Sequence, residues 1–312
     1  MKQRAITGII VSLIMIPLIL FDVLLIPFKI VIGLMAMLAV YELVRMYETK
    51  HELHLANKIV IFLITAALYL VIGNVWLGPN AFIYDMPLNP MYVLFPAVII
   101  LFILCVFNAK MRDQSLGFSF LTIFYIGLGF GALTYLKVLG AEYLLYLLIT
   151  TITTDSFAFF FGVKFGRHKM CPTISPKKSW EGAIAGTVFG TVFGTLFGVI
   201  ILPTNSGTIF DTAATFLLEN ASAVSMFDVL AVRTSPAWGL LSIFIPLTLA
   251  ISVIGQLGDL FASKLKRTYE IKDFGTILPG HGGILDRFDS ALFAGTFLVF
   301  IFKVMSILWP GI

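Results

Sequence analysis

Nine long apolar runs constrain this chain more than any other feature of its sequence. A helix needs about 17 to 25 residues of this kind to cross the roughly 30 Å of hydrocarbon in a bilayer. With 59% hydrophobic and 12% charged residues, the chain carries about half the charge of a soluble domain. We predict an all-α polytopic integral membrane protein with transmembrane helices at 6–26, 28–44, 59–77, 92–107, 116–136, 142–163, 183–202, 237–260 and 291–309.

The positions of Lys and Arg predict the orientation of these helices. All but four of the 21 basic residues fall in segments that share one side of the membrane, and the exceptions are Lys29, Lys137, Arg233 and Lys303. The positive-inside rule then places the N-terminus in the cytoplasm and the C-terminus outside. The net charge of +4 gives no indication of nucleic-acid binding, because the basic residues meet anionic headgroups and anionic substrates at one membrane face.

The polar residues are concentrated in the second half of the chain. We predict that 1–140 forms N-terminal transmembrane helices and that 141–312 forms a catalytic region with cytoplasmic motif loops, both within one integrated membrane domain. Glu42, near a helix end, is expected to pair with Arg45 or to reach the interface. The segments 78–90 and 203–236 are rich in turn residues and predict external loops.

A regular series of glycines marks the seventh apolar run. They recur at every fourth residue, at Gly182, Gly186, Gly190, Gly194 and Gly198. Such spacing leaves a bare ridge on one helix face, which lets helices approach closely enough for van der Waals packing in lipid. The ridge predicts a packing surface, either within the fold or between two copies of the chain.

Two stretches before and beside this run carry candidate ligands. Asp155 lies within an apolar segment, where a charge is costly without a partner, so we expect it to bind a cation rather than to hydrogen-bond a neighbouring helix. In "ISPKKSWEG" (174–182), adjacent lysines between two serines suit a phosphate group, namely Ser175, Lys177, Lys178 and Ser179. A loop that only sets the topology is an equally good interpretation of the second stretch.

The run from 255 to 290 carries the strongest chemical signal. Ser263 follows Asp259 by one helical turn, and Asp286 and Asp289 are three residues apart near the start of the last apolar run. Converging carboxylates favour a divalent cation such as Mg²⁺, which prefers oxygen ligands and retains waters or substrate phosphates.

Basic residues and glycines accompany these carboxylates. Lys266, Arg267 and Arg287 supply positive charge, and "PGHGG" predicts a tight turn whose backbone N–H groups can approach an anion. Carboxylates with Lys and Arg are the groups that phosphoryl and nucleotidyl transfer use, because the metal and the cations neutralise charge on the reacting phosphates.

The residues from Ser263 to Asp289 resemble the signature of phosphatidate cytidylyltransferases, also called CDP-diacylglycerol synthases. The matched positions are Ser263, Lys266, Arg267, Lys272, Asp273, His281, Gly282, Gly283, Asp286, Arg287 and Asp289. The resemblance implies a transferase of phospholipid biosynthesis that converts CTP and phosphatidic acid into CDP-diacylglycerol and pyrophosphate. It also implies Mg²⁺, a second monovalent cation such as K⁺, a homodimer, and a bacterial cell membrane with the active site on the cytoplasmic side.

The resemblance and the chemistry together assign expected roles. The expected metal ligands are Asp155, Asp259, Asp286 and Asp289. Asp259, Asp286 and Asp289 are also expected to act in catalysis, together with three basic residues: Lys266, Arg267 and Arg287. The expected substrate-binding residues are Ser175, Lys177, Lys178, Ser179, Ser263, Lys272, His281, Gly282 and Gly283.

Two other functions remain open from the sequence. One is a related CTP-dependent lipid enzyme, such as a CDP-archaeol synthase or a polyprenol kinase, since no residue identifies the lipid tail. The other is an ion-coupled transporter in which Asp155 and Asp259 would be intramembrane coupling carboxylates. The transporter accounts for the apolar helices but not for the Lys, Arg and Gly residues of the last motif.

Overall fold

Every predicted membrane span overlaps helical segments of the structure. The computed structural model describes residues 2–74, 89–108, 113–201, 237–277, 280 and 282–308. Its elements are α1 Lys2–Leu20, η1 Asp22–Leu24, α2 Leu25–Tyr47, α3 Leu55–Ile72, α4 Met91–Phe107, α5 Asp113–Thr122, η2 Ile123–Leu128, α6 Gly129–Leu139, α7 Ala141–Phe165, β1 Lys169–Cys171, β2 Ser175–Ser179, α8 Trp180–Ile201, α11 Ala237–Thr268 and α12 Leu285–Leu308.

The helices confirm an all-α polytopic membrane fold. Among the described residues, seven helices are long and apolar enough to cross a membrane, and two further apolar helices, Thr7–Leu20 and Met91–Phe107, are shorter. The number of crossings and their orientation stay predictions. The predicted external segment 203–236, most of 78–90 and the motif residue His281 lie outside the described residues.

The structure departs from the predicted spans at the side that carries the motifs. Helix α11 continues to Thr268 and α12 begins at Leu285, so both extend beyond their apolar cores and carry polar residues on regular helical turns. The predicted loop between α7 and α8 instead contains an antiparallel hairpin, in which Lys169 pairs with Ser179 and Cys171 with Ser175. Hydropathy alone does not report these polar extensions.

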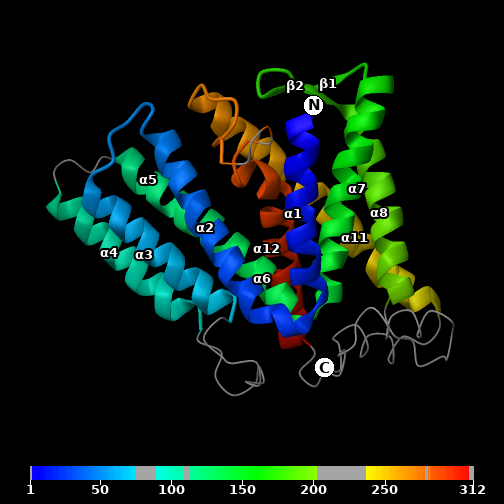
Figure 1. Ribbon diagram of the computed structural model, residues 1–312, viewed down its shortest axis with the longest axis horizontal. Helices are drawn as coiled ribbons and strands as arrows, with labels where there is room; N and C mark the ends of the chain where they lie inside the picture. The colour runs from blue at the N-terminus through cyan, green and yellow to red at the C-terminus, as the bar shows by residue number, and fades with distance from the viewer. Residues whose placement is uncertain are drawn as a thin grey trace.

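Helix α12 lies at the centre of the molecule. In Figure 1, α2, α3, α4 and α5 stand on one side of it, and α7, α8 and α11 stand on the other. It packs against α6, α7 and α11, and Leu285, Leu292 and Leu298 along it are fully buried. The residues at the beginning of α12 are therefore reached by both halves of the chain.

The glycine ridge of α8 is a contact inside the protein. A Cβ atom on Gly186 would lie 2.6 Å from the carbonyl oxygen of Thr154, and one on Gly182 would lie 2.6 Å from that of Ala158, both on α7. Further along, Gly198 meets Phe244 of α11 at 2.8 Å. The open question from the sequence is thus answered, because α7 and α11 occupy the ridge and leave it unavailable as a seam between two copies.

Substitution of a ridge glycine is expected to destabilise the protein. Gly186→Ala should lower the free energy of unfolding by about 1–3 kcal/mol, because the new methyl group overpacks against the α7 backbone. Gly117→Ala in α5 is the matched control, since no atom lies within 4 Å of its Cβ position and alanine is the better helix former. Thermal unfolding in detergent measures both. Equal stabilisation by the two substitutions would contradict the internal packing of the ridge.

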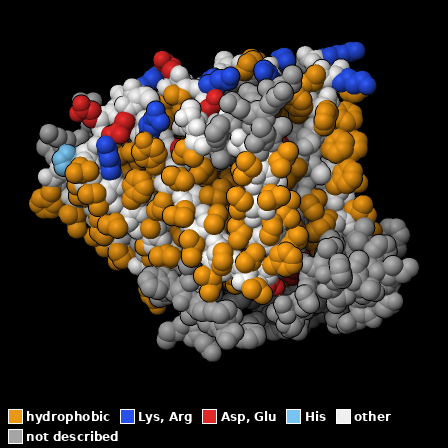
Figure 2. Space-filling view, in the orientation of Figure 1, with side chains coloured by type: hydrophobic (Ala, Val, Ile, Leu, Met, Phe, Trp, Pro, Cys, Tyr) orange, Lys and Arg blue, Asp and Glu red, His pale blue; other side chains and the backbone are white. Residues whose placement is uncertain are grey.

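Charged side chains gather at one edge of the molecule. Figure 2 shows Lys and Arg along the edge where Figure 1 places the β1–β2 hairpin, with a broad hydrophobic band below them. This separation suits a membrane protein, because the apolar band can face lipid while the charged edge faces water. It brings the motif residues of the hairpin, α11 and α12 to one level.

Candidate active site

The hairpin sends one of its two adjacent lysines toward the motif carboxylates. Lys178 forms an ion pair with Asp259 of α11 (Nζ to Oδ2, 2.6 Å), whereas Lys177 is exposed. The neighbouring Ser179 is buried and accepts a hydrogen bond from the backbone N–H of Gly182, so it caps α8.

Asp259 projects from the polar extension of α11. Its second carboxylate oxygen accepts a hydrogen bond of 3.3 Å from the hydroxyl of Ser263, one helical turn further on, as the spacing predicts. Gly258, directly before it, allows α12 to approach, because a Cβ atom there would lie 2.7 Å from the carbonyl oxygen of Asp289. The glycine therefore brings the Asp259 turn of α11 against the Asp289 turn of α12.

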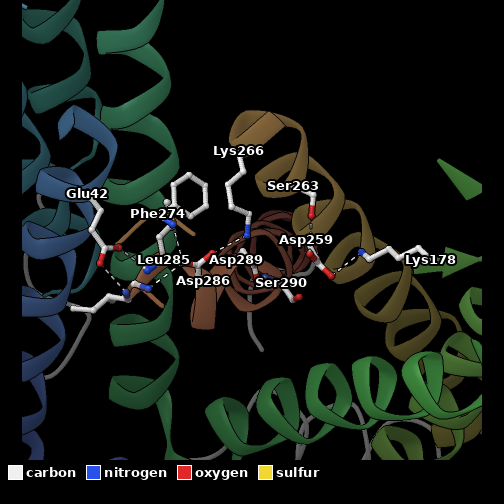
Figure 3. Close-up of polar contacts among 12 residues, drawn as sticks. Glu42, Lys178, Asp259, Ser263, Lys266, Phe274, Leu285, Asp286, Asp289 and Ser290 are labelled. Atoms are coloured by element: carbon white, nitrogen blue, oxygen red, sulfur yellow. Dashed lines mark hydrogen bonds and ion pairs between the residues drawn. The ribbon is translucent and has the colours of Figure 1, made fainter. Parts of the chain in front are cut away.

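Asp286, in the first turn of α12, binds the ammonium group of Lys266 and two backbone N–H groups. Its Oδ1 pairs with Lys266 of α11 at 2.7 Å, and its Oδ2 accepts hydrogen bonds from the backbone N–H groups of Phe274 (2.8 Å) and Gly283 (2.9 Å). The ammonium group of Lys266 also lies over the Phe274 ring, 5.0 Å from its centroid. Figure 3 shows Asp286 between Lys266 and the turn that precedes α12. Asp286 thus fixes Lys266 in place.

Glu42 supports this turn from the opposite half of the chain. It is 1% exposed and accepts hydrogen bonds from the backbone N–H groups of Ile284 (2.9 Å) and Leu285 (3.0 Å) at the start of α12. A carboxylate at this helix end is favoured by the helix dipole. The expected pairing with Arg45 or placement at the interface is wrong, because the unsatisfied N–H groups of a distant helix provide a better partner than an exposed arginine.

The glycines of the last motif are required by this arrangement. Gly282 has a positive φ of 86°, which residues with a side chain rarely adopt. A Cβ atom on Gly283 would lie 2.5 Å from Oε1 of Glu42. The two residues shape a turn in which the N–H of Gly283 is directed to Asp286 and that of Ile284 to Glu42, and the binding of an anion by this motif stays a prediction.

Asp289 and Asp155 meet on the far side of α12. Asp289 is 9% exposed and accepts the backbone N–H of Ser290 at 2.8 Å, and the Ser290 hydroxyl donates to Asp155 of α7 at 3.1 Å. Asp155, Asp259 and Asp289 repel one another electrostatically, with Lys178 acting on Asp155 and Lys266 on Asp289 in the opposite sense. Three helices and one strand therefore converge on a cluster of like charges.

The described residues contain no group of three or more His, Cys, Asp or Glu side chains placed to hold a metal ion together. Asp286 has both of its oxygens engaged by Lys266 and by backbone N–H groups. Both oxygens of Asp259 are engaged as well, but by the side chains of Lys178 and Ser263, and buried Asp289 accepts the backbone N–H of Ser290 with one oxygen. The four-aspartate metal site expected from the sequence is not assembled as a single group here.

Other predicted residues lie at the rim of the cluster. Arg267 donates a hydrogen bond from Nε to the carbonyl oxygen of Ile174 at 3.2 Å, which ties α11 to the hairpin. Lys272 and Arg287 are exposed, and Ser175 is half-buried in β2. The structure thus brings together Lys178, Asp259, Ser263, Lys266, Asp286, Asp289 and Asp155, and leaves the remaining predicted cations on the surface.

The supporting roles of two residues were not predicted from the sequence. Ser290 links Asp155 to α12, and its position directly after Asp289 was the available signal. Glu42 lies 242 residues from its partner Ile284, so only the cost of a charge in an apolar helix indicated that it needed a distant contact.

Comparison with known proteins identifies the family of this chain. The profile described as the cytidylyltransferase family matches residues 2–305. The chain is 33% identical to the phosphatidate cytidylyltransferase of Bacillus subtilis (strain 168), over 98% of this chain and 99% of that one. It is 28% identical to the protein of the same name from Thermotoga maritima over 90% of both chains, and 35% identical to that of Staphylococcus aureus (strain COL) over 56% of this chain and 55% of the other. The chain that carries this cluster of carboxylates and lysines at its charged edge belongs to the cytidylyltransferase family.

Proposed function

We propose that this protein transfers the CMP group of CTP to phosphatidic acid, which gives CDP-diacylglycerol and pyrophosphate. The observation that carries the proposal is the convergence of Lys178 and Lys266 with Asp259 and Asp289 at the charged edge of an apolar helix bundle. At this level a water-soluble triphosphate and a lipid headgroup can meet. The names of the full-length relatives support the same reaction.

The two lysines would bind phosphate groups of the substrates. Each ammonium group has three N–H donors, of which one is directed to a carboxylate, so further donors remain for phosphate oxygens. A phosphate oxygen of phosphatidic acid is ionised at neutral pH and attacks the α-phosphorus of CTP. The bond from that phosphorus to the bridging oxygen breaks, and pyrophosphate leaves with both electrons. The chief barrier is repulsion between anions, which preorganised positive charge lowers.

Mg²⁺ is part of this proposal. Mg²⁺ is usually held by one or two carboxylates together with substrate phosphates and water. Asp259 and Asp289, which repel each other across the α11–α12 contact, fit that donor set, with Asp155 beside them. Asp286 fits a different role, because two backbone N–H groups hold one of its oxygens and Lys266 the other, whereas the partners of Asp259 are the side chains of Lys178 and Ser263, which a metal could displace. When bound, the metal would neutralise charge on the phosphates.

Further properties implied by the resemblance also remain proposals. They are a second monovalent cation such as K⁺, a homodimer, and a bacterial cell membrane with the site on the cytoplasmic side. The gathering of basic residues at the hairpin edge supports the cytoplasmic placement. A homodimer would have to use a surface other than the glycine ridge, which is filled by α7 and α11.

A doubly labelled assay tests the reaction. Purified protein in detergent receives phosphatidic acid, Mg²⁺ and CTP labelled either in the cytosine ring or in the γ-phosphate. We expect ring label in the lipid product, γ-label only in pyrophosphate, and loss of both signals when EDTA removes Mg²⁺.

The position of the label separates the proposal from its rivals. A γ-label in the lipid, with a polyprenol as acceptor, would identify a kinase. Ring label in an archaeol phosphate but not in phosphatidic acid would identify the archaeal reaction. Folded protein that yields neither product would contradict cytidylyl transfer to a lipid.

A further inference from the structure

An apolar groove lies between η2, α11 and α12. It has a volume of about 560 Å³, within the range of roughly 300–1,000 Å³ that small-molecule sites occupy. Apart from Tyr125 and Thr296 its lining is entirely hydrophobic: Leu121, Phe124, Leu128, Ile254, Phe261, Leu292, Phe293, Phe297 and Phe300. The Thr296 hydroxyl bonds the backbone of its own helix at Leu292, so it offers no free donor to the groove.

The groove begins one helical turn beyond Asp289 on α12. The residues of α12 that line it follow Asp289 by 3, 4, 7, 8 and 11 positions, which places them on the helix face that begins at Asp289. At 1.5 Å per residue this face extends about 16 Å from Asp289, roughly half of the 30 Å thickness of the hydrocarbon layer. Phe300, at its far end, is exposed where lipid would surround the protein. The groove therefore spans one leaflet, with the cluster at its polar end.

Tyr125 stands where the groove meets the cluster. Its ring packs against Phe261 and Phe293, with centroids 5.4 and 5.3 Å away. Its hydroxyl oxygen is buried and has no hydrogen-bond partner among the described residues, although it lies in the electrostatic field of Asp289 and Asp259. A buried unpaired hydroxyl is costly, so it indicates a partner that is absent from the protein alone.

The backbone at Tyr125 is unusual as well. It lies in η2, a six-residue π-helical segment that interrupts the helix Asp113–Leu139. Segments of this kind often occur at functional sites, because the widened turn redirects side chains. Here the π-helical segment carries Phe124, Tyr125 and Leu128 of the groove wall.

We propose that the groove holds an acyl chain of the lipid substrate and that Tyr125 donates a hydrogen bond to an oxygen of that lipid's glycerol phosphate end. The inference rests on the proposed function for the identity of the lipid. A start one turn beyond Asp289, a length of about one leaflet and an unpaired donor at the polar end favour this occupant over a second copy of the chain. Tyr125 is then a residue of lipid recognition.

The first test removes only the hydroxyl. Tyr125→Phe should raise KM for phosphatidic acid about tenfold, through loss of a hydrogen bond to a charged or ester oxygen, and leave KM for CTP unchanged. The melting temperature of the variant should not fall, because the deleted hydroxyl has no partner in the free protein. A lower melting temperature, or equal changes in both KM values, would assign Tyr125 a purely structural role and overturn the inference.

The second test fills the groove. Thr296→Trp should reduce turnover of dioleoyl phosphatidic acid by at least about tenfold relative to the dihexanoyl lipid, whose short chains bury little apolar area. Val106→Trp is the matched control, since Val106 is exposed on α4 away from the groove. An equal loss of turnover with both lipids, or equal effects of the two Trp substitutions, would contradict the binding of an acyl chain in the groove.

A binding measurement separates this inference from the proposed function. Phosphatidic acid with a diazirine at the end of one acyl chain is photolysed with wild-type protein in the absence of CTP, and labelled peptides are mapped. We expect labelling near Phe297 and Phe300, and competition by unlabelled phosphatidic acid but not by phosphatidylcholine. Label spread evenly over exposed helices would contradict the binding of an acyl chain in the groove, even if the enzyme is active. Specific labelling without catalysis would instead support the groove as a lipid-binding site and contradict the proposed reaction.

Discussion

Asp289→Asn is expected to abolish cytidylyl transfer, with turnover reduced at least about a thousandfold. Asparagine keeps the oxygen that accepts the Ser290 N–H and nearly the same volume, so the loss reports the missing negative charge. Turnover of CTP and phosphatidic acid is measured at saturating concentrations of both substrates. The Mg²⁺ concentration for half-maximal activity should rise for whatever residual rate remains, because the proposed metal would lose a ligand.

The control for this substitution is another aspartate at the same side of the bundle. Asp113, exposed in the first turn of α5, is outside the carboxylate cluster, and Asp113→Asn should retain wild-type turnover. Thermal unfolding should show that both variants are folded. Near-normal turnover of the Asp289 variant would remove this residue from the catalytic site and transfer its assigned role to Asp259.

Among the substitutions proposed here, Glu42→Ala is expected to lower the free energy of unfolding the most. It leaves the N–H groups of Ile284 and Leu285 buried without acceptors, at about 1–3 kcal/mol each. We therefore expect the melting temperature in detergent to fall by about 6 °C or more. Turnover at a permissive temperature should also fall, because the start of α12 positions both Asp286 and Asp289.

Two further variants separate support of the turn from general effects of charge removal. Glu42→Gln keeps an oxygen acceptor and should restore part of the stability. Glu270→Ala removes a carboxylate that also joins the two halves of the chain, through an ion pair of 2.6 Å with Lys50, but at the exposed surface. It should change the melting temperature little. Equal losses for Glu42→Ala and Glu270→Ala would contradict the role of Glu42 under α12.

The helices of this fold are largely predictable from its sequence, because in lipid the length of an apolar run is itself a structural constraint. The polar extensions of α11 and α12 are less so. Residues such as Ser263 and Lys266 lie beyond the hydrophobic segment, and only their one-turn spacing from other polar residues indicates a helix. The pairing of Ser263 with Asp259 confirms that spacing.

The site was predicted by residue type better than by role. Lys178 and Lys177 are equivalent in the sequence, and the hairpin makes them different, because it brings Lys178 to Asp259 and leaves Lys177 exposed. Asp286 resembles a metal ligand in spacing, yet Lys266 of α11 engages one of its oxygens and the backbone N–H groups of Phe274 and Gly283 engage the other. Such distinctions depend on contacts between segments far apart in the chain, which no local pattern encodes.

The contact between Glu42 and α12 also bears on how the protein is made. The carboxylate lies on α2, and its partners lie 242 and 243 residues later in the chain, at the start of the last described helix. At about 5–20 residues per second, the interval between the two is on the order of tens of seconds. Until α12 is inserted, neither Asp286 nor Asp289 has its final position, so an incomplete chain in the membrane is catalytically silent.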